Sequence, residues 1–166
     1  VHKAPANEIV QGARDVEFNL SHECHDLNPR GINVIRRFPG RGILVWGART
    51  CSGEPEWKYI NVRRLSMYIE SSIIKGTQWV VFEPNDQQLW ARLKQSISNF
   101  LTVVWRDGAL MGSTPDQAFF VKIDRSTMTQ TDIDNGILKG TVGIAAIRPA
   151  EFIIIGLHLR TMGAVS

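Results

Sequence analysis

The strongest constraint on the fold is the order of apolar patterns between residues 43 and 105. Residues 43–48 are apolar on both faces, as expected for a strand that has a neighbour on each side. Residues 61–75 and 86–105 instead carry apolar side chains at three- and four-residue spacing, which predicts amphipathic helices. A second doubly apolar run, 79–82, lies between them. Strand, helix, strand and helix in this order predict right-handed crossovers and parallel pairing.

Local signals mark the ends of both predicted helices. Asn61 is expected to cap the first helix, and Lys75 and Gly76 supply a basic last turn and a C-terminal glycine. Asn85 with Gln88 resembles a capping box for the second helix. The apolar stripe of the second helix comprises Leu89, Leu93, Ile97, Phe100, Leu101, Val104 and Trp105.

The remaining segments predict shorter elements around this centre. Further strands are expected at 16–20, 32–38 and 118–123, single helical turns at 22–28 and 131–135, and extended runs at 137–147 and 151–160. The sequence therefore predicts an α/β fold: a single domain with a mixed β-sheet, a parallel centre flanked by helices, and extended terminal arms. Within residues 1–166 we expect an N-terminal arm (1–15), a globular core (16–147) and a C-terminal linking strand with its tail (148–166).

Two tryptophans lie in the doubly apolar runs. Trp46 belongs to residues 43–48 and Trp79 begins residues 79–82. Because both runs are predicted as interior strands, both side chains are expected to be buried at the centre of the sheet.

Composition limits the class of protein. At 166 residues the chain has the size of one domain, and 43% hydrophobic with 21% charged residues favours neither a disordered nor a membrane class. The longest purely apolar run, 152–155, is the length of a strand, whereas a membrane span needs about 20 residues. Cys24 and Cys51 fit no metal spacing and are expected to be reduced thiols. Since the chain begins at Val1 without Met or a signal-peptide pattern, we expect a fragment that lacks its N-terminal part.

No motif in the sequence predicts catalysis or a cofactor. The glycines at 40 and 42 precede a strand, whereas a phosphate loop follows one and opens a helix, so we interpret them as a turn. The stretch 22–25 (His-Glu-Cys-His) gathers possible metal ligands, but no distant Cys or His pair completes a zinc site. Residues 132–136 match a calcium loop only in part. We therefore expect no enzyme activity, no catalytic residues, no metal and no cofactor.

The positive charge leaves a binding function open. The formal net charge is +3, and the excess comes largely from arginines between Arg30 and Arg64. Trp46 and Trp57 lie among these arginines, yet no nucleic-acid-binding signature is present. A basic α/β module that binds an acidic partner or nucleic acid is therefore the alternative hypothesis.

The C-terminal run, residues 151–160, is too apolar for an exposed edge strand. One face consists of Ile153, Ile155, Leu157 and Leu159, and the other carries Phe152, Ile154 and His158. Such a strand left at an open edge would promote aggregation, so it must pair within its own domain or with another chain. The preceding Pro149 lacks a backbone donor and lets the chain change direction. Both an intramolecular hairpin with residues 137–147 and a link to a second chain remain possible.

Several motifs, taken in order, resemble the C-terminal domain of the phage tail sheath family. They are KAPAN at 3–7, NPRGIN at 28–33, GRG at 40–42, VWGART at 45–50, NVRR at 61–64, QWVVFEPN at 78–85 and PAEF at 149–152. Each motif is moderately specific, and their order and spacing together are strongly so. The resemblance covers nearly the whole chain, although the outer inserted domain and the N-terminal arm of the family are missing from it.

This resemblance implies a structural subunit of a contractile phage tail, an R-type pyocin or a related contractile injection system. It implies hexameric layers that stack into a helical sheath around an inner tube, stay linked by strand exchange and contract to drive the tube through a target envelope. The implied partners are the protein itself, the inner tube protein, the baseplate and the tail terminator, without nucleic acid and without membrane insertion. Assembly is expected in the bacterial cytoplasm, and the product is a virion tail or a phage-tail-like particle.

The resemblance also suggests two sets of site residues. The inter-subunit strand is expected to comprise Glu151, Phe152, Ile153, Ile154, Ile155, Leu157 and Leu159. Since sheath subunits hold their tube largely through charge on an inward-facing helix, Arg92 and Lys94 are expected to be basic residues that face the tube.

Overall fold

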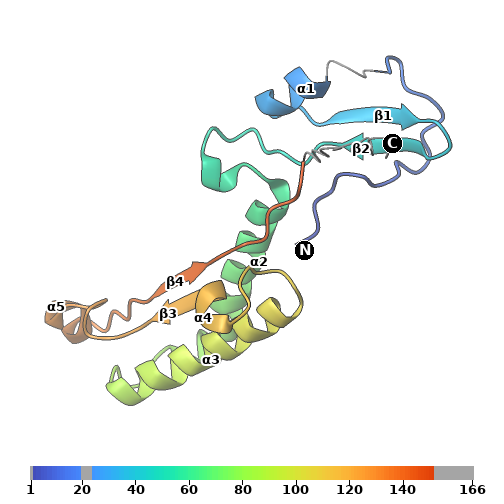
Figure 1. Ribbon diagram of the computed structural model, residues 1–166. Helices are drawn as coiled ribbons and strands as arrows, with labels where there is room; N and C mark the ends of the chain where they lie inside the picture. The colour runs from blue at the N-terminus through green and yellow to red at the C-terminus, as the bar shows by residue number, and fades with distance from the viewer. Residues whose placement is uncertain (1, 20–23, 152–166) are drawn as a thin grey trace, which may run out of the picture.

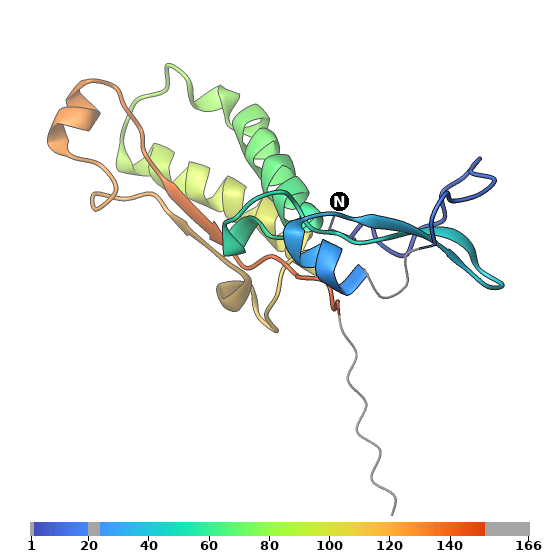
Figure 2. The same ribbon diagram turned by 90° about the horizontal axis from the view of Figure 1, so that it is seen from above.

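Two long helices and two separate strand pairs form the framework of the computed structural model, which describes residues 2–19 and 24–151 (Figure 1). The elements are α1 (Cys24–Leu27), η1 (Asn28–Arg30), β1 (Val34–Phe38), β2 (Gly42–Trp46), η2 (Pro55–Trp57), α2 (Ile60–Gly76), η3 (Gln78–Val80), α3 (Gln87–Arg106), α4 (Pro115–Ala118), β3 (Phe119–Lys122), α5 (Gln130–Asp134) and β4 (Thr141–Ile144). The β1–β2 hairpin extends from one end of the molecule, while α2, α3 and the β3–β4 pair form the other (Figures 1 and 2).

The hydrophobic core is built around one stripe of α3. Leu89, Leu93 and Leu101 are almost completely buried, and Ile97 and Val104 of the same stripe are buried as well. Leu65 and Ile69 of α2 and residues of the β3 region complete the cluster. The amphipathic helix predicted over 86–105 is therefore confirmed. Burial of each large aliphatic side chain contributes about 1.5–3 kcal/mol, so this stripe dominates the packing of the domain.

The sheet differs from the expected parallel arrangement. β1 pairs with β2 and β3 pairs with β4, both antiparallel, and the described residues contain no parallel pair. The expectation failed because residues 79–82 do not form a strand: η3 and a turn occupy the connection between α2 and α3. Mixed helix and strand in one small domain is confirmed, whereas the parallel centre is not.

The two tryptophans are consequently not at the centre of a sheet. Trp46 is half-buried and packs against Phe38, with ring centroids 4.5 Å apart. Trp79 is 41% exposed because its segment never enters a sheet. The predicted strand at 16–20 is also absent from residues 16–19, where Phe18 is exposed.

The helices begin differently from their predicted caps. Tyr59 is the N-cap residue of α2, and Asn61 instead lies inside the helix, only 2% exposed. Asp86, rather than Asn85, caps α3, because its carboxylate accepts a hydrogen bond from the Leu89 amide. A Thr129–Asp132 capping box starts α5.

The N-terminal arm pairs with the outer edge of β2 and so lies beside the hairpin as a third extended segment. The Asn7 amide donates to Val45 O and the Val10 amide to Ile43 O, both at 2.8 Å, while the Val45 amide donates to Glu8 O at 3.0 Å. β2 therefore has main-chain partners on both sides, which agrees with its doubly apolar sequence. Gly40 and Gly42 have positive φ angles in the β1–β2 turn, as their interpretation as a structural turn requires.

Candidate functional site at the start of the C-terminal run

A charged cluster holds the last described residue of the chain. Arg49 donates from Nε to Glu151 Oε1 and from Nη2 to Glu151 Oε2, each at 2.8 Å. The Tyr59 hydroxyl donates to Glu151 Oε2 at 3.1 Å, and Lys58 Nζ lies 3.6 Å from the same oxygen. The Arg49 and Glu151 side chains are only 12% and 17% exposed. We refer to Arg49, Lys58, Tyr59 and Glu151 as the arm-root cluster.

The backbone around Arg49 is fixed from two directions. Asn33 Nδ2 donates to Arg49 O, and the Arg49 amide donates to Asn33 Oδ1, both at 2.8 Å. On the other side Arg49 forms an antiparallel bridge with Tyr59, which brings two cluster residues together. Gly47 permits this packing, because a Cβ there would lie 2.6 Å from Asn33 Oδ1. The backbone of Arg49 is thus held by contacts that do not involve Glu151.

The cluster stabilises the ionised form of Glu151. The hydrogen bonds from Arg49 are the largest cause that lowers the pKa of Glu151, burial opposes the shift, and the Tyr59 hydroxyl adds to it. The pKa of Arg49 is raised, first by its hydrogen bonds to Glu151. A bidentate pair of this kind fixes orientation as well as position, so the Glu151 carboxylate is held in a defined place beside β2.

A second polar side chain, at the start of α2, contacts both the N-terminal arm and the segment that leads to Glu151. Asn61 Nδ2 donates to His2 O and to Ile147 O, each at 2.9 Å. Beside it, Arg64 Nη2 donates to Lys3 O at 2.7 Å. The N-terminal arm and the segment that leads to Glu151 therefore meet at one place (Figure 1). The residue expected to cap α2 instead positions the two arms.

The outer edge of β1 has an unpaired position. Val45 directs its amide and carbonyl to the N-terminal arm, so Ile35, which is opposite Val45, directs its own main-chain groups away from β2. Arg37, two residues on, gives its amide to Asn19 Oδ1 at 3.3 Å. Among the described residues Ile35 has no main-chain partner on that side. An incoming strand could pair there.

The predicted site residues are only partly described by the structure. Glu151 lies in the arm-root cluster, whereas Phe152, Ile153, Ile154, Ile155, Leu157 and Leu159 lie outside the described residues. Sequence reasoning did not identify Arg49 or Tyr59, which are 102 and 92 positions from Glu151. The local sequence signal for this cluster is the carboxylate of Glu151, which stands directly before the apolar run.

Arg92 and Lys94, the predicted tube-facing residues, point to different sides of α3. Both are exposed, but residues two apart lie about 200° from each other around a helix. Arg92 stacks over Trp79 and pairs with Glu83 at 3.6 Å. Arg106 lies about four turns further on the Arg92 side. Arg92 and Lys94 therefore cannot both contact one flat surface through the same face of α3.

The described residues contain no cluster of His, Cys, Asp and Glu side chains suited to a metal ion. The 22–25 stretch, which the sequence offered for that role, lies partly outside the described part of the chain. In the same described part, no helix has the length and hydrophobicity to span a membrane.

Comparison with known proteins gives one consistent family. Residues 52–160 match the phage tail sheath C-terminal domain. The tail sheath protein of Burkholderia phage BcepMu is 31% identical over 121 residues, which cover 64% of this chain and 24% of that protein. A putative prophage major tail sheath protein of Pseudomonas aeruginosa is 22% identical and covers 89% of this chain and 38% of that protein.

Solved structures agree with the sequence comparison. A chain in the anti-feeding prophage baseplate has a TM-score of 0.90 and 45% identity, covering 96% of this chain and 45% of that one. A chain in the contracted sheath of the extracellular injection system PVC has a TM-score of 0.88 and 43% identity, covering 94% of this chain and 45% of that one. The present chain thus spans less than half the length of these relatives.

Proposed function

The chain belongs to the phage tail sheath C-terminal domain family, and on this premise we propose that it is a structural, non-catalytic part of a contractile sheath subunit. Copies of the subunit stack as hexameric layers around an inner tube and contract to drive it through a target envelope. The inner tube protein, the baseplate and the tail terminator are its further partners. Assembly takes place in the bacterial cytoplasm before the particle acts.

The observation that carries this proposal is the arm-root cluster. It fixes Glu151 directly before an apolar run that needs a covered partner, so the run leaves from a defined point. A strand that links two subunits through a large rearrangement must keep its own end attached to its domain. Arg49 and Tyr59 provide that attachment, and Asn61 secures Ile147, four residues before Glu151.

The outer edge of β1 in a second copy is the proposed acceptor for the run. Strand addition there would use the main-chain groups of Ile35, and alternate side chains would set the register. Each main-chain hydrogen bond contributes about 0.5–1.5 kcal/mol net, so the amide and carbonyl of Ile35 supply part of the link and the apolar face of the run supplies the rest. Because the N-terminal arm already covers the other side of β2, the outer edge of β1 is the side of this hairpin that the described residues leave for the contact.

The tube contact is proposed to use Arg92 and Lys94 as two separate basic positions on α3. Individual exposed ion pairs contribute about 0–1 kcal/mol, but a sheath repeats them at every subunit. Reversing both charges should release the tube while the domain stays folded. Normal tube retention by the double variant would exclude α3 as the tube-facing helix.

Deletion of residues 152–166 from the full-length protein tests the linking strand. Glu151 is retained so that the arm-root cluster stays intact. We expect a folded monomer, seen by circular dichroism and sedimentation, that forms no tubes in electron micrographs. Deletion of residues 161–166 alone is the matched control and should leave assembly intact. An unfolded or aggregated product of the longer deletion would instead support the intramolecular hairpin.

A further inference from the structure

A fully exposed aromatic side chain projects from the loop between α2 and α3. Phe82 is 102% exposed, and its φ of 70° lies in the left-handed region, which is costly for a bulky residue. Val81 and Trp79 beside it are 62% and 41% exposed. Strained backbone that directs an apolar side chain into solvent suggests a contact surface rather than a packing requirement.

Hydrogen bonds hold this Phe82 loop in place. The Glu83 amide donates to Val80 O at 3.1 Å, which closes the turn that contains Phe82. Asn85 accepts from Trp90 Nε1 at 2.8 Å and donates to Ile137 O at 3.4 Å, which ties the loop to α3 and to the segment before β4. A loop that is already ordered loses little entropy when it binds.

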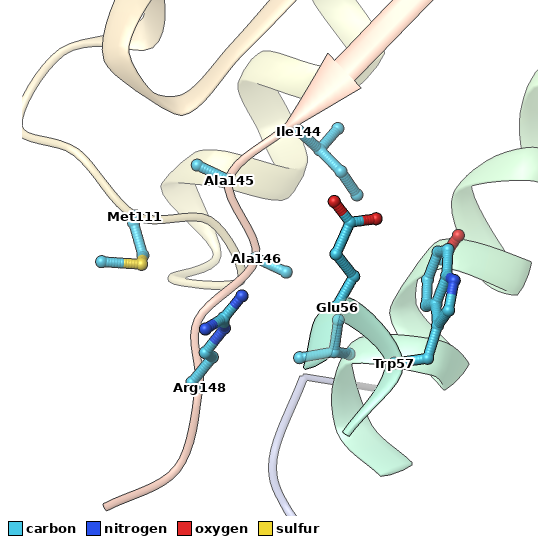
Figure 3. Close-up of a pocket in the computed structure, with 9 residues that line it drawn as sticks. Glu56, Trp57, Met111, Ile144, Ala145, Ala146 and Arg148 are labelled. Atoms are coloured by element: carbon cyan, nitrogen blue, oxygen red, sulfur yellow. The ribbon is translucent and has the colours of Figure 1, made fainter. Parts of the chain in front are cut away.

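A groove of about 480 Å³ lies on another part of the molecule, between η2, α2 and the segment after β4 (Figure 3). Its walls include Val62, Met111, Ile144, Ala145 and Ala146. Glu56 and Arg148 extend into it from opposite sides, and no ion pair engages either one among the described residues (Figure 3). The groove therefore combines an apolar floor with one acidic and one basic wall.

The groove also offers main-chain groups. The Met111 amide donates to Ala145 O at 2.7 Å and the Ile147 amide donates to Ala109 O at 3.3 Å. In this antiparallel bridge Ala146 and Leu110 direct their own amides and carbonyls away from each other. Ala146 thus presents a donor and an acceptor on the side away from residues 109–111. A loop from another molecule could form main-chain hydrogen bonds with this amide and carbonyl.

We propose that Phe82 of one copy inserts into this groove of a second copy. The charges are complementary, since Glu83 follows Phe82 and can meet Arg148. Met111 is 53% exposed and flexible enough to close over an aromatic ring. This contact rests on the proposed self-assembly but is separate from the linking strand and from the tube contact.

A second copy is the occupant that this arrangement favours. The projecting loop and the groove are different surfaces of one chain, so each copy can donate one and accept one. Heterologous contacts of this kind form a closed ring when the rotation between copies closes on itself. When it does not, the contacts repeat without end and give a helical assembly.

Disulfide trapping in the full-length protein tests the contact directly. Val81→Cys, which leaves the Phe82 side chain in place, and Ala146→Cys are placed in one chain in which Cys24 and Cys51 are replaced by serine. Mild oxidation should give a reducible ladder of covalent oligomers, because a disulfide needs Cα atoms about 4.4–6.8 Å apart. Mixing the two single variants should give dimers only. Val81→Cys paired with Glu70→Cys, an exposed position on α2, is the matched control and should give no ladder.

A charge exchange provides an independent measurement. Phe82→Ala should weaken subunit association at least about 30-fold, as expected when an anchoring aromatic residue is removed. Glu83→Arg should also weaken association, and Arg148→Glu in the same chain should restore it. Absence of the ladder in particles that form tubes would exclude the contact but leave the sheath function intact. Absence of tubes with a ladder present would exclude the sheath function but leave the contact.

Discussion

Replacement of Arg49 by Ala is the most informative single change in this domain. It removes two charge-assisted hydrogen bonds to Glu151 and leaves that carboxylate with Tyr59 and Lys58. Loss of one partner from a buried ion pair costs about 3–5 kcal/mol. Because the two side chains remain 12% and 17% exposed, water can replace part of the lost contact, so we expect about 2–3 kcal/mol.

Thermal and urea unfolding of the 166-residue chain measure this loss. For a chain of this size each kcal/mol lowers the melting temperature by about 2–4 °C, so a decrease of about 4–12 °C is expected. Arg92→Ala is the matched control, because it breaks an Arg–Glu pair whose side chains are 60% and 43% exposed. That change should cost about 0–1 kcal/mol. Equal losses for the two variants would contradict the assignment of Arg49 as a structural anchor.

The dependence on pH gives a second check of the same reasoning. Arg49 lowers the pKa of Glu151 below its ordinary value of 4.5, so the ionised carboxylate stabilises the folded state fully above that value. This stabilisation is lost as the pH falls through the lowered pKa. The difference in stability between the wild type and Arg49→Ala should therefore shrink in acid. A difference that stays constant down to the acid unfolding transition would refute the charge-based explanation.

Three further changes test other parts of the structure. Asn61→Ala should cost about 1–3 kcal/mol in urea unfolding, because it leaves the His2 and Ile147 carbonyls without their donor, and faster amide exchange in both arms should accompany it. Trp90→Ala should cost about 3–5 kcal/mol, since Trp90 is 5% exposed, whereas Trp79→Ala should cost under about 1 kcal/mol; the reverse order would be evidence against the packing described. Gly47→Ala should lower the melting temperature more than Gly53→Ala, because an added Cβ meets Asn33 only at position 47.

The sequence predicted the elements whose signals are local. The apolar stripe of α3 is set by spacing within one helix, and it is found as expected from Leu89 to Val104. Residues 79–82 have the composition of a strand, but a strand exists only where another segment pairs with it. Their apolar side chains are instead largely exposed at the loop before α3. Composition alone does not distinguish a buried strand from an exposed contact loop.

The candidate site was harder to predict because its residues are distant in sequence. An Asn directly before an apolar periodic segment is the usual sign of a helix cap, yet the Asn61 amide is turned toward the arms. The Arg49–Glu151 pair spans 102 positions, so no local spacing could indicate it. Glu151 was included in the predicted linking strand for its place in the chain, not for the partners that fix it.

The position of Asn61 has a mechanical consequence. Its single amide nitrogen holds the N-terminal arm at His2 and the outgoing chain at Ile147. Once the Arg49–Glu151 pair has given way, tension applied along the chain after Ile147 would reach the N-terminal arm through two hydrogen bonds at the start of α2. The force passes only through the first turn of α2, and the leucine-rich core around α3 lies outside its path. Because Asn61 contacts both segments, the domain can transmit a pull between its two ends while the hydrophobic core carries little of the strain.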